Sequence, residues 1–164
     1  MEEFLLQQGS EQLAPVKVGD IAPDFSLPDQ FGQSVKLGDY LGKKPVVLYF
    51  YPKDFTMGCT KEACAFRDSY EAFKDLGAEV IGVSTATSEK HGEFASTYKL
   101  PFKILADDGG RVRELYGVPS SLGLLPGRVT YIIDRTGVVR YVFNSQFNPA
   151  KHVEEALRIL RTLS

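Results

Sequence analysis

Apolar positions along this chain alternate between short continuous runs and helical spacings. The β-rich apolar runs at residues 45–51, 78–85 and 102–107 predict strands, and the first two are typical of strands buried on both faces. Between the first two runs, apolar residues recur every three or four positions, at Ala63, Phe66, Tyr70, Phe73 and Leu76. This spacing predicts an amphipathic helix that starts near Gly58 and is closed by Gly77.

The second half of the chain continues the alternation. Residues 88–99 predict a helix capped by Ser88, and residues 109–117 predict a short helix that a glycine ends. Two further β-rich runs, at 128–134 and 138–144, are joined by the segment "RTG", which is typical of a tight hairpin.

The two ends of the chain add further elements. Residues 22–44 contain short extended pieces broken by Pro and Gly, with a hairpin turn at residues 29–33. A closing helix is expected with Asn148 as its N-cap and Pro149 as its first residue. The first residues show no clear pattern, so residues 1–17 are expected to form a loose N-terminal arm.

The order of these elements predicts the fold class. Strands that alternate with helices favour a parallel sheet with right-handed crossovers, and the late hairpin adds antiparallel strands. We therefore expect an α/β fold of the thioredoxin-like kind, with a central mixed sheet, helices on both faces and an N-terminal β-hairpin extension. No repeat or linker divides the chain, so residues 18–164 are expected to form a single domain.

Composition and charge narrow the classes of function. Apolar residues make up 43% of the 164 residues, which favours a buried core over disorder. The formal net charge of −2 gives no electrostatic reason to expect nucleic acid or a membrane as a partner. The acidic start is typical of neither a secretory signal nor a transit peptide. We expect a cytoplasmic, reducing compartment, or a plastid-type compartment if a targeting segment has been removed.

Both cysteines of the chain, Cys59 and Cys64, lie where the predicted helix begins. Cys59 follows the carboxyl end of a predicted central strand, which is the region of an open α/β sheet where ligands and chemistry gather. Unpaired backbone N–H groups and the positive end of the helix dipole stabilise a thiolate there. Because the thiolate is the nucleophilic form of cysteine, a reactive thiol is expected at Cys59.

The spacing of the two cysteines limits how they can form a disulfide. Residues five apart in an α-helix are separated by about 7.5 Å of rise and roughly 140° of rotation, which puts their Cα atoms about 8–9 Å apart. A disulfide requires a Cα separation below about 7 Å. Cys59 and Cys64 therefore cannot be bridged in an intact helix. This favours a transient disulfide, formed when the first turns unwind, over a permanent one.

Two residues before Cys59 have candidate roles. Thr56 and Cys59 have the spacing of a capping box, so we expect the Thr56 hydroxyl within hydrogen-bond reach of the Cys59 sulfur. Pro52 fixes its φ angle and offers no N–H, so it either walls off one side of the loop or simply ends the strand.

Other interpretations of the cysteines stay open on the residues alone. Cys64 could be an ordinary core residue. A zinc site needs about four ligands, and the chain's histidines, His91 and His152, fall in helices predicted to lie apart. A Cys–His hydrolase would need a base near Cys59, and neither histidine has a recognisable place there. We expect His91 on a solvated helix face. Cys-x-x-Cys is absent, which disfavours a plain dithiol reductase.

The segment "YPKDFTMGCTKEAC" resembles the Pro-x-x-x-Thr-x-x-Cys active-site loop of the peroxiredoxins, with Pro52, Thr56 and Cys59 in the three matching positions. A second cysteine five residues on, here Cys64, is the arrangement of the Q-type peroxiredoxins, also called bacterioferritin comigratory proteins. The similarity extends through "VGDIAPDFSLPDQFGQ", "LPFKILAD" and "LPGRVTYIIDRTGVV". It covers nearly the whole chain and is strongest toward plant and cyanobacterial members.

This resemblance implies a thioredoxin-like fold and a thiol peroxidase that reduces hydrogen peroxide and organic hydroperoxides. Cys59 would be the peroxidatic cysteine that becomes a sulfenic acid, and Cys64 would resolve it as an intramolecular disulfide. The family's active-site arginine corresponds to Arg128 in "PGRVTY". The backbone N–H groups of Gly58 and Cys59, together with Thr56 and Arg128, would bind the peroxide.

The resemblance also implies the partners of the chain. Thioredoxin, or a related dithiol protein, would restore the thiols by exchange. No metal, haem or flavin is implied, because sulfur carries the redox chemistry. An intramolecular resolving cysteine removes the need for a second subunit, so a monomer is expected. The alternative function is a redox-sensing or thiol–disulfide exchange module without substantial peroxidase turnover.

Overall fold

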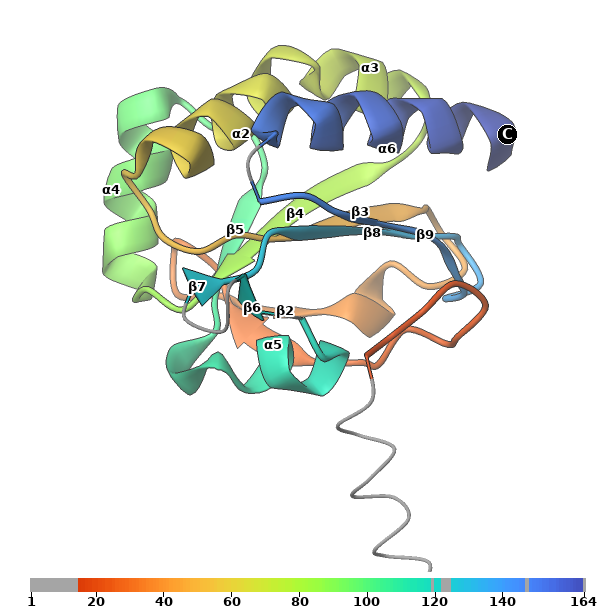
Figure 1. Cartoon of the computed structure of the whole chain (residues 1–164), viewed down its shortest axis with the longest axis horizontal. Helices are drawn as coiled ribbons and strands as arrows, with labels where there is room; N and C mark the ends of the chain where they lie inside the picture. The colour runs from red at the N-terminus through yellow and green to blue at the C-terminus, as the bar shows by residue number, and fades with distance from the viewer. Residues whose placement is uncertain (1–14, 119, 122–124, 147, 164) are drawn as a thin grey trace, which may run out of the picture.

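A mixed β-sheet forms the centre of the molecule (Figure 1). Its strands lie side by side in the order β5 (Lys103–Ala106), β4 (Glu79–Ser84), β3 (Val46–Phe50), β8 (Val129–Ile133) and β9 (Val139–Asn144). Strands β3, β4 and β5 are parallel, whereas β8 is antiparallel to both β3 and β9. The mixed sheet predicted from the sequence is therefore confirmed.

The computed structural model describes residues 15–118, 120–121, 125–146 and 148–163. Most of the expected N-terminal arm, residues 1–17, thus lies outside the described residues.

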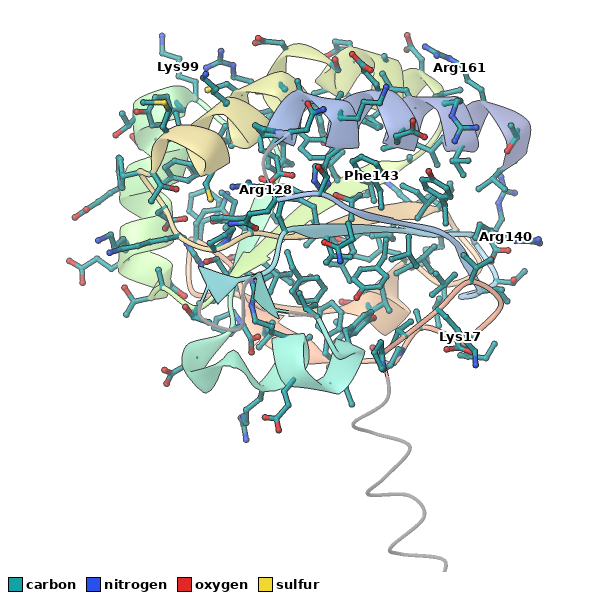
Figure 2. All side chains as sticks on the ribbon, viewed as in Figure 1. Lys17, Lys99, Arg128, Arg140, Phe143 and Arg161 are labelled. Carbon is teal, nitrogen blue, oxygen red and sulfur yellow. The ribbon has the colours of Figure 1, made fainter. Side chains whose placement is uncertain are left out.

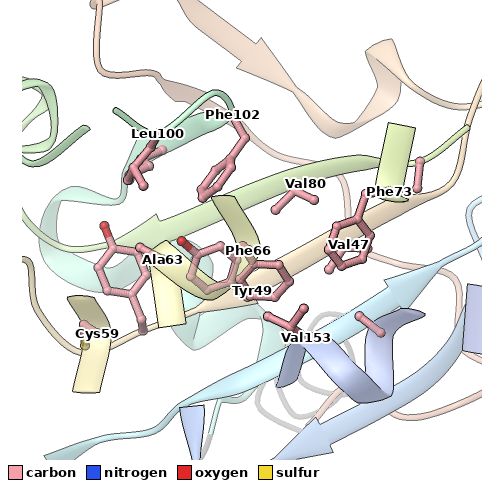
Figure 3. Close-up of a cluster of buried hydrophobic side chains, with 14 of the residues drawn as sticks. Val47, Tyr49, Cys59, Ala63, Phe66, Phe73, Val80, Leu100, Phe102 and Val153 are labelled. Carbon is pink, nitrogen blue, oxygen red and sulfur yellow. The ribbon is translucent and has the colours of Figure 1, made fainter. Parts of the chain in front are cut away.

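The central strand β3 is buried because its side chains alternate between two apolar clusters. Val47 and Tyr49 belong to the cluster on the helical side of the sheet, which Figure 3 shows in close-up. Val46, Leu48 and Phe50 belong to the cluster on the opposite side. A strand that contributes to two cores needs apolar residues at every position, which explains its continuous apolar sequence.

Helices cover the first face of the sheet: α2 (Met57–Asp68), α3 (Tyr70–Asp75), α4 (Ser88–Tyr98) and α6 (Pro149–Leu163). The single helix predicted between residues 58 and 77 is wrong, because Ser69, with φ −100° and ψ 7°, separates α2 from α3. The apolar spacing continues across the break since Phe66 and Phe73 share one buried face, with ring centroids 5.7 Å apart. Gly77 has a φ of +73°, which confirms its predicted closing role.

Two predicted helix starts have different outcomes. Thr87, not Ser88, caps α4, because Thr87 has extended backbone angles and its Oγ1 accepts a hydrogen bond from the Lys90 amide at 3.2 Å. The predicted Ser88 cap is therefore wrong by one residue. Helix α6 begins at Pro149, as predicted.

The other face of the sheet carries the N-terminal hairpin, short turns and a helix: β1 (Ser26–Pro28), β2 (Ser34–Lys36), η1 (Leu37–Asp39), η2 (Asp108–Gly110) and α5 (Arg111–Tyr116). The predicted hairpin and the helices on both faces are confirmed. A short antiparallel pair, β6 (Ser120–Ser121) and β7 (Leu125–Pro126), precedes β8 and was not predicted.

Arg128 differs from most charged side chains of the protein because it is buried. Lys99 and Arg140 point outward in Figure 2, whereas Arg128 lies inside the molecule and is only 3% exposed. A buried guanidinium requires nearby acceptors and negative charge, so its surroundings indicate a built site. No helix in the described ranges is both long and apolar enough to cross a lipid bilayer.

Candidate active site

Cys59 lies in the first turn of α2, and 1% of its surface is exposed. The loop from Tyr51 to Thr56, here called the catalytic loop, connects the carboxyl end of β3 to this helix. With Thr56 at the N-cap, Cys59 is the third helical residue, where the backbone N–H has no acceptor within the helix. The positive end of the helix dipole stabilises a thiolate at this position. The predicted placement of Cys59 at a helix start is confirmed.

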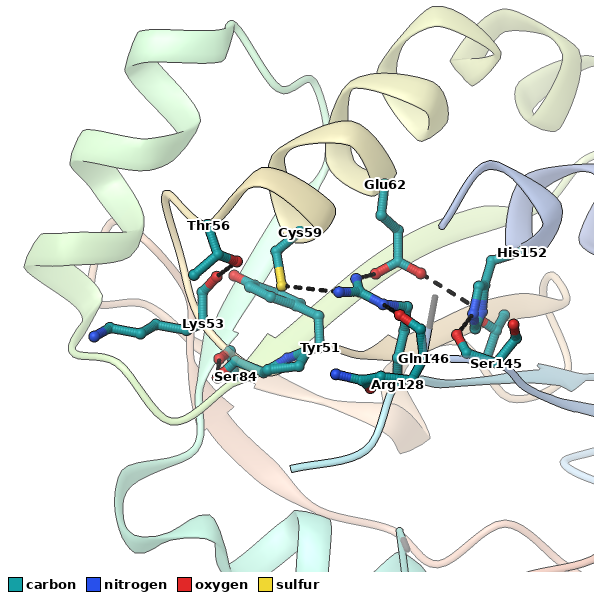
Figure 4. Close-up of polar contacts among 12 residues, drawn as sticks. Tyr51, Lys53, Thr56, Cys59, Glu62, Ser84, Arg128, Ser145, Gln146 and His152 are labelled. Carbon is teal, nitrogen blue, oxygen red and sulfur yellow. Dashed lines mark hydrogen bonds and ion pairs between the residues drawn. The ribbon is translucent and has the colours of Figure 1, made fainter. Parts of the chain in front are cut away.

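Arg128, immediately before β8, brings a fixed cation to the Cys59 sulfur (Figure 4). Its Nη2 donates a hydrogen bond to Cys59 Sγ at 3.4 Å, and its Nε donates to the backbone oxygen of Gln146 at 3.2 Å. A Cβ at Gly58 would lie 3.0 Å from Arg128 Nη2. A glycine therefore lets the guanidinium approach the helix start closely.

Glu62 orients Arg128 from within the same helix. It is completely buried, and its Oε1 accepts a hydrogen bond from Arg128 Nη1 at 2.7 Å. Burial raises the pKa of Glu62 above its usual value, and the guanidinium of Arg128 opposes this rise by favouring the charged carboxylate. For Arg128, burial lowers the pKa, but the charges of Glu62 and Cys59 outweigh burial and raise it. Glu62 was not among the site residues expected from the sequence, and the structure makes it the partner of the site's cation.

His152 of α6 extends this group of buried charges, although the sequence placed it in a distant helix. Its Nε2 donates to the Ser145 carbonyl at 2.8 Å, so a neutral ring leaves Nδ1 to accept from the Thr130 hydroxyl at 2.7 Å. His152 Nδ1 also lies 3.5 Å from Glu62 Oε2. Burial lowers the pKa of His152 to about 4, which keeps the ring neutral at pH 7.

Thr56 does not make the contact expected from its spacing. Its hydroxyl donates to the Lys53 carbonyl at 2.9 Å, and it forms no side-chain cap on α2. Among the described residues, the hydrogen bond at the Cys59 sulfur comes from Arg128. The expectation that Thr56 faces the sulfur like a capping box is therefore wrong, because the hydroxyl is used to shape the catalytic loop itself.

Side chains hold successive carbonyls of the catalytic loop. Arg113 Nη2 donates to the Tyr51 carbonyl at 2.8 Å, and Ser84 Oγ donates to the Pro52 carbonyl at 3.2 Å. Thr56 holds the next carbonyl, that of Lys53. Pro52 is half-buried at the start of this segment. The loop that leads to Cys59 is thus fixed by its surroundings rather than by regular secondary structure.

Cys64 lies on α2 beyond the first turn and is partly exposed. Both thiols are free, and α2 is continuous from Met57 to Asp68. The structure therefore presents the pair in one intact helix, as the sequence predicted.

His91 contradicts its expected place on a solvated helix face. It is completely buried, and its Nδ1 lies 2.6 Å from Asp54 Oδ2 in the catalytic loop. Asp54 Oδ1 in turn accepts a hydrogen bond from the Tyr51 hydroxyl at 2.5 Å. His91 precedes Phe94 and Tyr98 at three- and seven-residue spacing, so it lies on the apolar stripe of α4. That spacing was the signal in the sequence that could have revealed its burial.

Comparisons with known proteins show the family of the chain. The model of the AhpC/TSA family matches residues 18–142. The chain is 56% identical to peroxiredoxin Q, chloroplastic, of Sedum lineare, over 92% of this chain and 81% of that protein. It is 58% identical to peroxiredoxin Q, chloroplastic, of Arabidopsis thaliana, over 90% of this chain and 68% of that protein.

A solved structure shows the fold class of the chain. The peroxidoxin BcpB from Mycobacterium tuberculosis is 39% identical to this chain with a TM-score of 0.84, and the match covers 91% of this chain and 99% of that one. This likeness bears out the thioredoxin-like class. The chain belongs to the AhpC/TSA family, among the peroxiredoxins of the Q type.

Proposed function

We propose that this chain is a thiol-dependent peroxidase that reduces hydrogen peroxide and organic hydroperoxides through Cys59 and Cys64. The observation that carries the proposal is the buried contact of 3.4 Å between Arg128 Nη2 and Cys59 Sγ at the start of α2. This contact joins a nucleophile to a fixed cation where the peroxide would react. Kinship with the peroxiredoxin Q proteins supports turnover, and does not favour a redox sensor or an exchange module without it.

In the first step, the Cys59 thiolate attacks one oxygen of the peroxide. The S–O bond forms and the O–O bond breaks, so sulfur is oxidised by two electrons to a sulfenic acid. The hydroxide or alkoxide that leaves takes up the proton that the Cys59 thiol released to solvent on ionising, so that water or an alcohol is the second product. Negative charge builds on the peroxide oxygens during this step. The guanidinium of Arg128 and the free N–H groups of Gly58 and Cys59 would stabilise that negative charge.

In the second step, the Cys64 thiolate attacks the sulfenic sulfur. The S–S bond forms, the S–O bond breaks, and the hydroxide leaves as water after it takes a proton. An intact α2 keeps the two Cα atoms too far apart for this bond, so its first turns unwind before the disulfide forms. A dithiol protein, for which we propose thioredoxin or a relative, then reduces the disulfide by exchange.

Pro52 and Thr56 serve this cycle by shaping the catalytic loop. The Pro52 and Lys53 carbonyls are held by Ser84 and Thr56, which supports a loop fixed in advance of peroxide binding. Preorganisation of this kind avoids the cost of ordering the loop during the reaction.

The placement of both cysteines on one helix bears on the oligomeric state of the protein. Because both reacting cysteines lie on one helix, no second subunit is needed to complete the site, and we propose a monomer. Sedimentation at micromolar concentration should give the mass of one chain, and a dimer mass would contradict this.

The relatives' chloroplastic location favours a plastid-type compartment over a cytoplasmic one. Immunolabelling of cell sections tests this.

Peroxide turnover with paired cysteine variants tests the function. In an assay with thioredoxin and its reductase, Cys59→Ser should abolish peroxide consumption. Cys64→Ser should abolish thioredoxin-driven cycling but still allow one rapid oxidation of Cys59. If Cys59→Ser consumes peroxide at the parent rate, the assignment fails. Disulfide exchange without any peroxide consumption by the parent protein would instead support the exchange module.

A further inference from the structure

A buried polar cluster ties the catalytic loop to helix α4, and the chemical steps above make no use of it. The cluster consists of Tyr51, Asp54 and His91, and we call it the loop latch. All three side chains are at most 2% exposed. Both carboxylate oxygens of Asp54 are engaged, one by the Tyr51 hydroxyl at 2.5 Å and the other by His91 Nδ1 at 2.6 Å. His91 Nε2 lies 3.3 Å from the Ser84 carbonyl, which anchors the ring to the end of β4.

Just after the latch, the backbone conformation and the exposure of the side chains both change. Phe55 has a φ of +63°, a backbone conformation that is uncommon for a bulky residue. Beyond it, Met57 is 76% exposed at the first position of α2. The side chains of Tyr51 and Asp54 are therefore held in the interior, whereas the side chain of Met57, at the first helical position, lies in solvent.

The same face of α4 also receives the Phe55 side chain. The Phe55 ring packs edge-on against Phe94 with centroids 5.2 Å apart, and its centroid lies 6.2 Å from that of Tyr98. His91, Phe94 and Tyr98 follow one another at helical spacing on α4. Asp54 and Phe55 thus dock together on one stripe, next to the segment that must unwind.

The chemistry of the latch suits a contact that opens and closes. A buried carboxylate–imidazole pair is strongly directional, so it specifies one loop position. Its net contribution to stability is small, because both groups regain hydration when they separate. An apolar contact of the same size would not regain hydration in this way, and it would resist release more strongly.

We propose that Tyr51, Asp54 and His91 are positioning residues that hold the catalytic loop in its peroxide-reactive conformation. By doing so they set how fast Cys59 is released to Cys64. Lifting the loop from α4 opens the latch and permits the first turns of α2 to unwind. This inference rests on the proposed cycle of Cys59 and Cys64, and it names residues outside the reacting groups that control the balance between its two steps.

The population of the unwound form gives the size of the expected effect. If the wound form predominates, disulfide formation proceeds at a rate proportional to the small unwound fraction. Loss of one latch hydrogen bond changes that fraction by about fivefold. The first-order rate of disulfide formation should rise by the same factor. Oxidation uses the wound form, which stays dominant, so its second-order rate constant should fall by less than twofold.

The test measures both steps in the full chain after rapid mixing with hydrogen peroxide. Samples are quenched in acid and alkylated, and intact mass then separates thiol, sulfenic acid and disulfide. Tyr51→Phe deletes the latch hydroxyl alone, and Asp54→Asn removes the charge of the carboxylate. The matched control is Tyr116→Phe, which deletes a buried hydroxyl bonded to the Pro23 carbonyl at 2.7 Å on the opposite face of the sheet. Urea unfolding shows whether the two Tyr→Phe variants lose similar global stability.

If the latch acts as proposed, Tyr51→Phe and Asp54→Asn form the disulfide faster than the parent protein and are over-oxidised less to sulfinic acid. Tyr116→Phe keeps the parent rates. Parent or slower disulfide formation in Tyr51→Phe overturns the proposal, whether or not Asp54→Asn folds. Equal acceleration in Tyr116→Phe also overturns it, because the effect would then come from general loosening. If the parent protein forms no disulfide at all, the proposed function fails instead.

Discussion

At the scale of single residues, the site depends on buried charges that are shared among a few side chains. Arg128 contacts both the Cys59 sulfur and Glu62, and His152 borders Glu62 from α6. Arg128 and Glu62 are 66 positions apart in the sequence. A contact over that separation leaves no local pattern, so the position of Arg128 came from the family resemblance and the role of Glu62 could not be predicted.

His152 predicts a component of the pH dependence of stability. Burial lowers its pKa from 6.5 to about 4, so below pH 6.5 the unfolded chain binds a proton that the folded chain excludes. The contribution of neutral His152 is therefore complete above pH 6.5 and is lost as the pH falls toward 4. Complete loss of this contribution lowers the free energy of unfolding by about 3 kcal/mol.

Replacing this side chain should flatten that part of the profile. The free energy of unfolding of His152→Gln, from urea titrations between pH 7 and pH 4, should fall less steeply than that of the parent protein. The variant will be less stable at pH 7, because the Thr130 hydroxyl and the Ser145 carbonyl lose their partner. Parallel profiles for the two proteins would show that His152 does not carry this pH dependence.

At the scale of elements, the start of α2 is the part that must change shape. Thr56 has φ −81° and ψ 155°, angles that a following proline accepts, and Met57 is exposed at the first helical position. The sequence located this helix start and the cysteine pair upon it. It missed the break at Ser69, because two helices that bury the same face show one continuous apolar spacing.

Stiffening this start should slow the release of Cys59. Met57→Pro restricts the unwound chain more than the helix, an effect typically worth about 0.4–1 kcal/mol. Disulfide formation after a peroxide pulse, followed by stopped flow, should slow by about two- to fivefold. Ser88→Pro makes the same change at the first position of α4 and should keep the parent rate. An unchanged rate in Met57→Pro would contradict the view that unwinding of α2 limits this step.

At the scale of the whole molecule, the fold followed from sequence because its pattern is repeated and local. The central strand β3 is a continuous apolar run, and the connection between the parallel strands β3 and β4 carries the active-site helix α2. The loop latch escaped prediction because Asp54 and His91 meet over 37 positions, a separation that leaves no local pattern, although the helical spacing of His91 with Phe94 indicated that His91 is buried. The reacting cysteines could therefore be identified from the sequence, whereas the polar contacts that position the catalytic loop join residues far apart in the chain and could not.

Intact mass after one equivalent of hydrogen peroxide shows whether Cys59 and Cys64 form a disulfide with each other. The reduced chain should lose two hydrogens, because Cys59 and Cys64 form an internal disulfide despite their positions on one helix. In Cys64→Ser, the same treatment should add one oxygen to Cys59 and leave no disulfide. A parent chain that gains oxygen without forming the disulfide, or that keeps its mass, would show that Cys59 and Cys64 do not form the proposed pair.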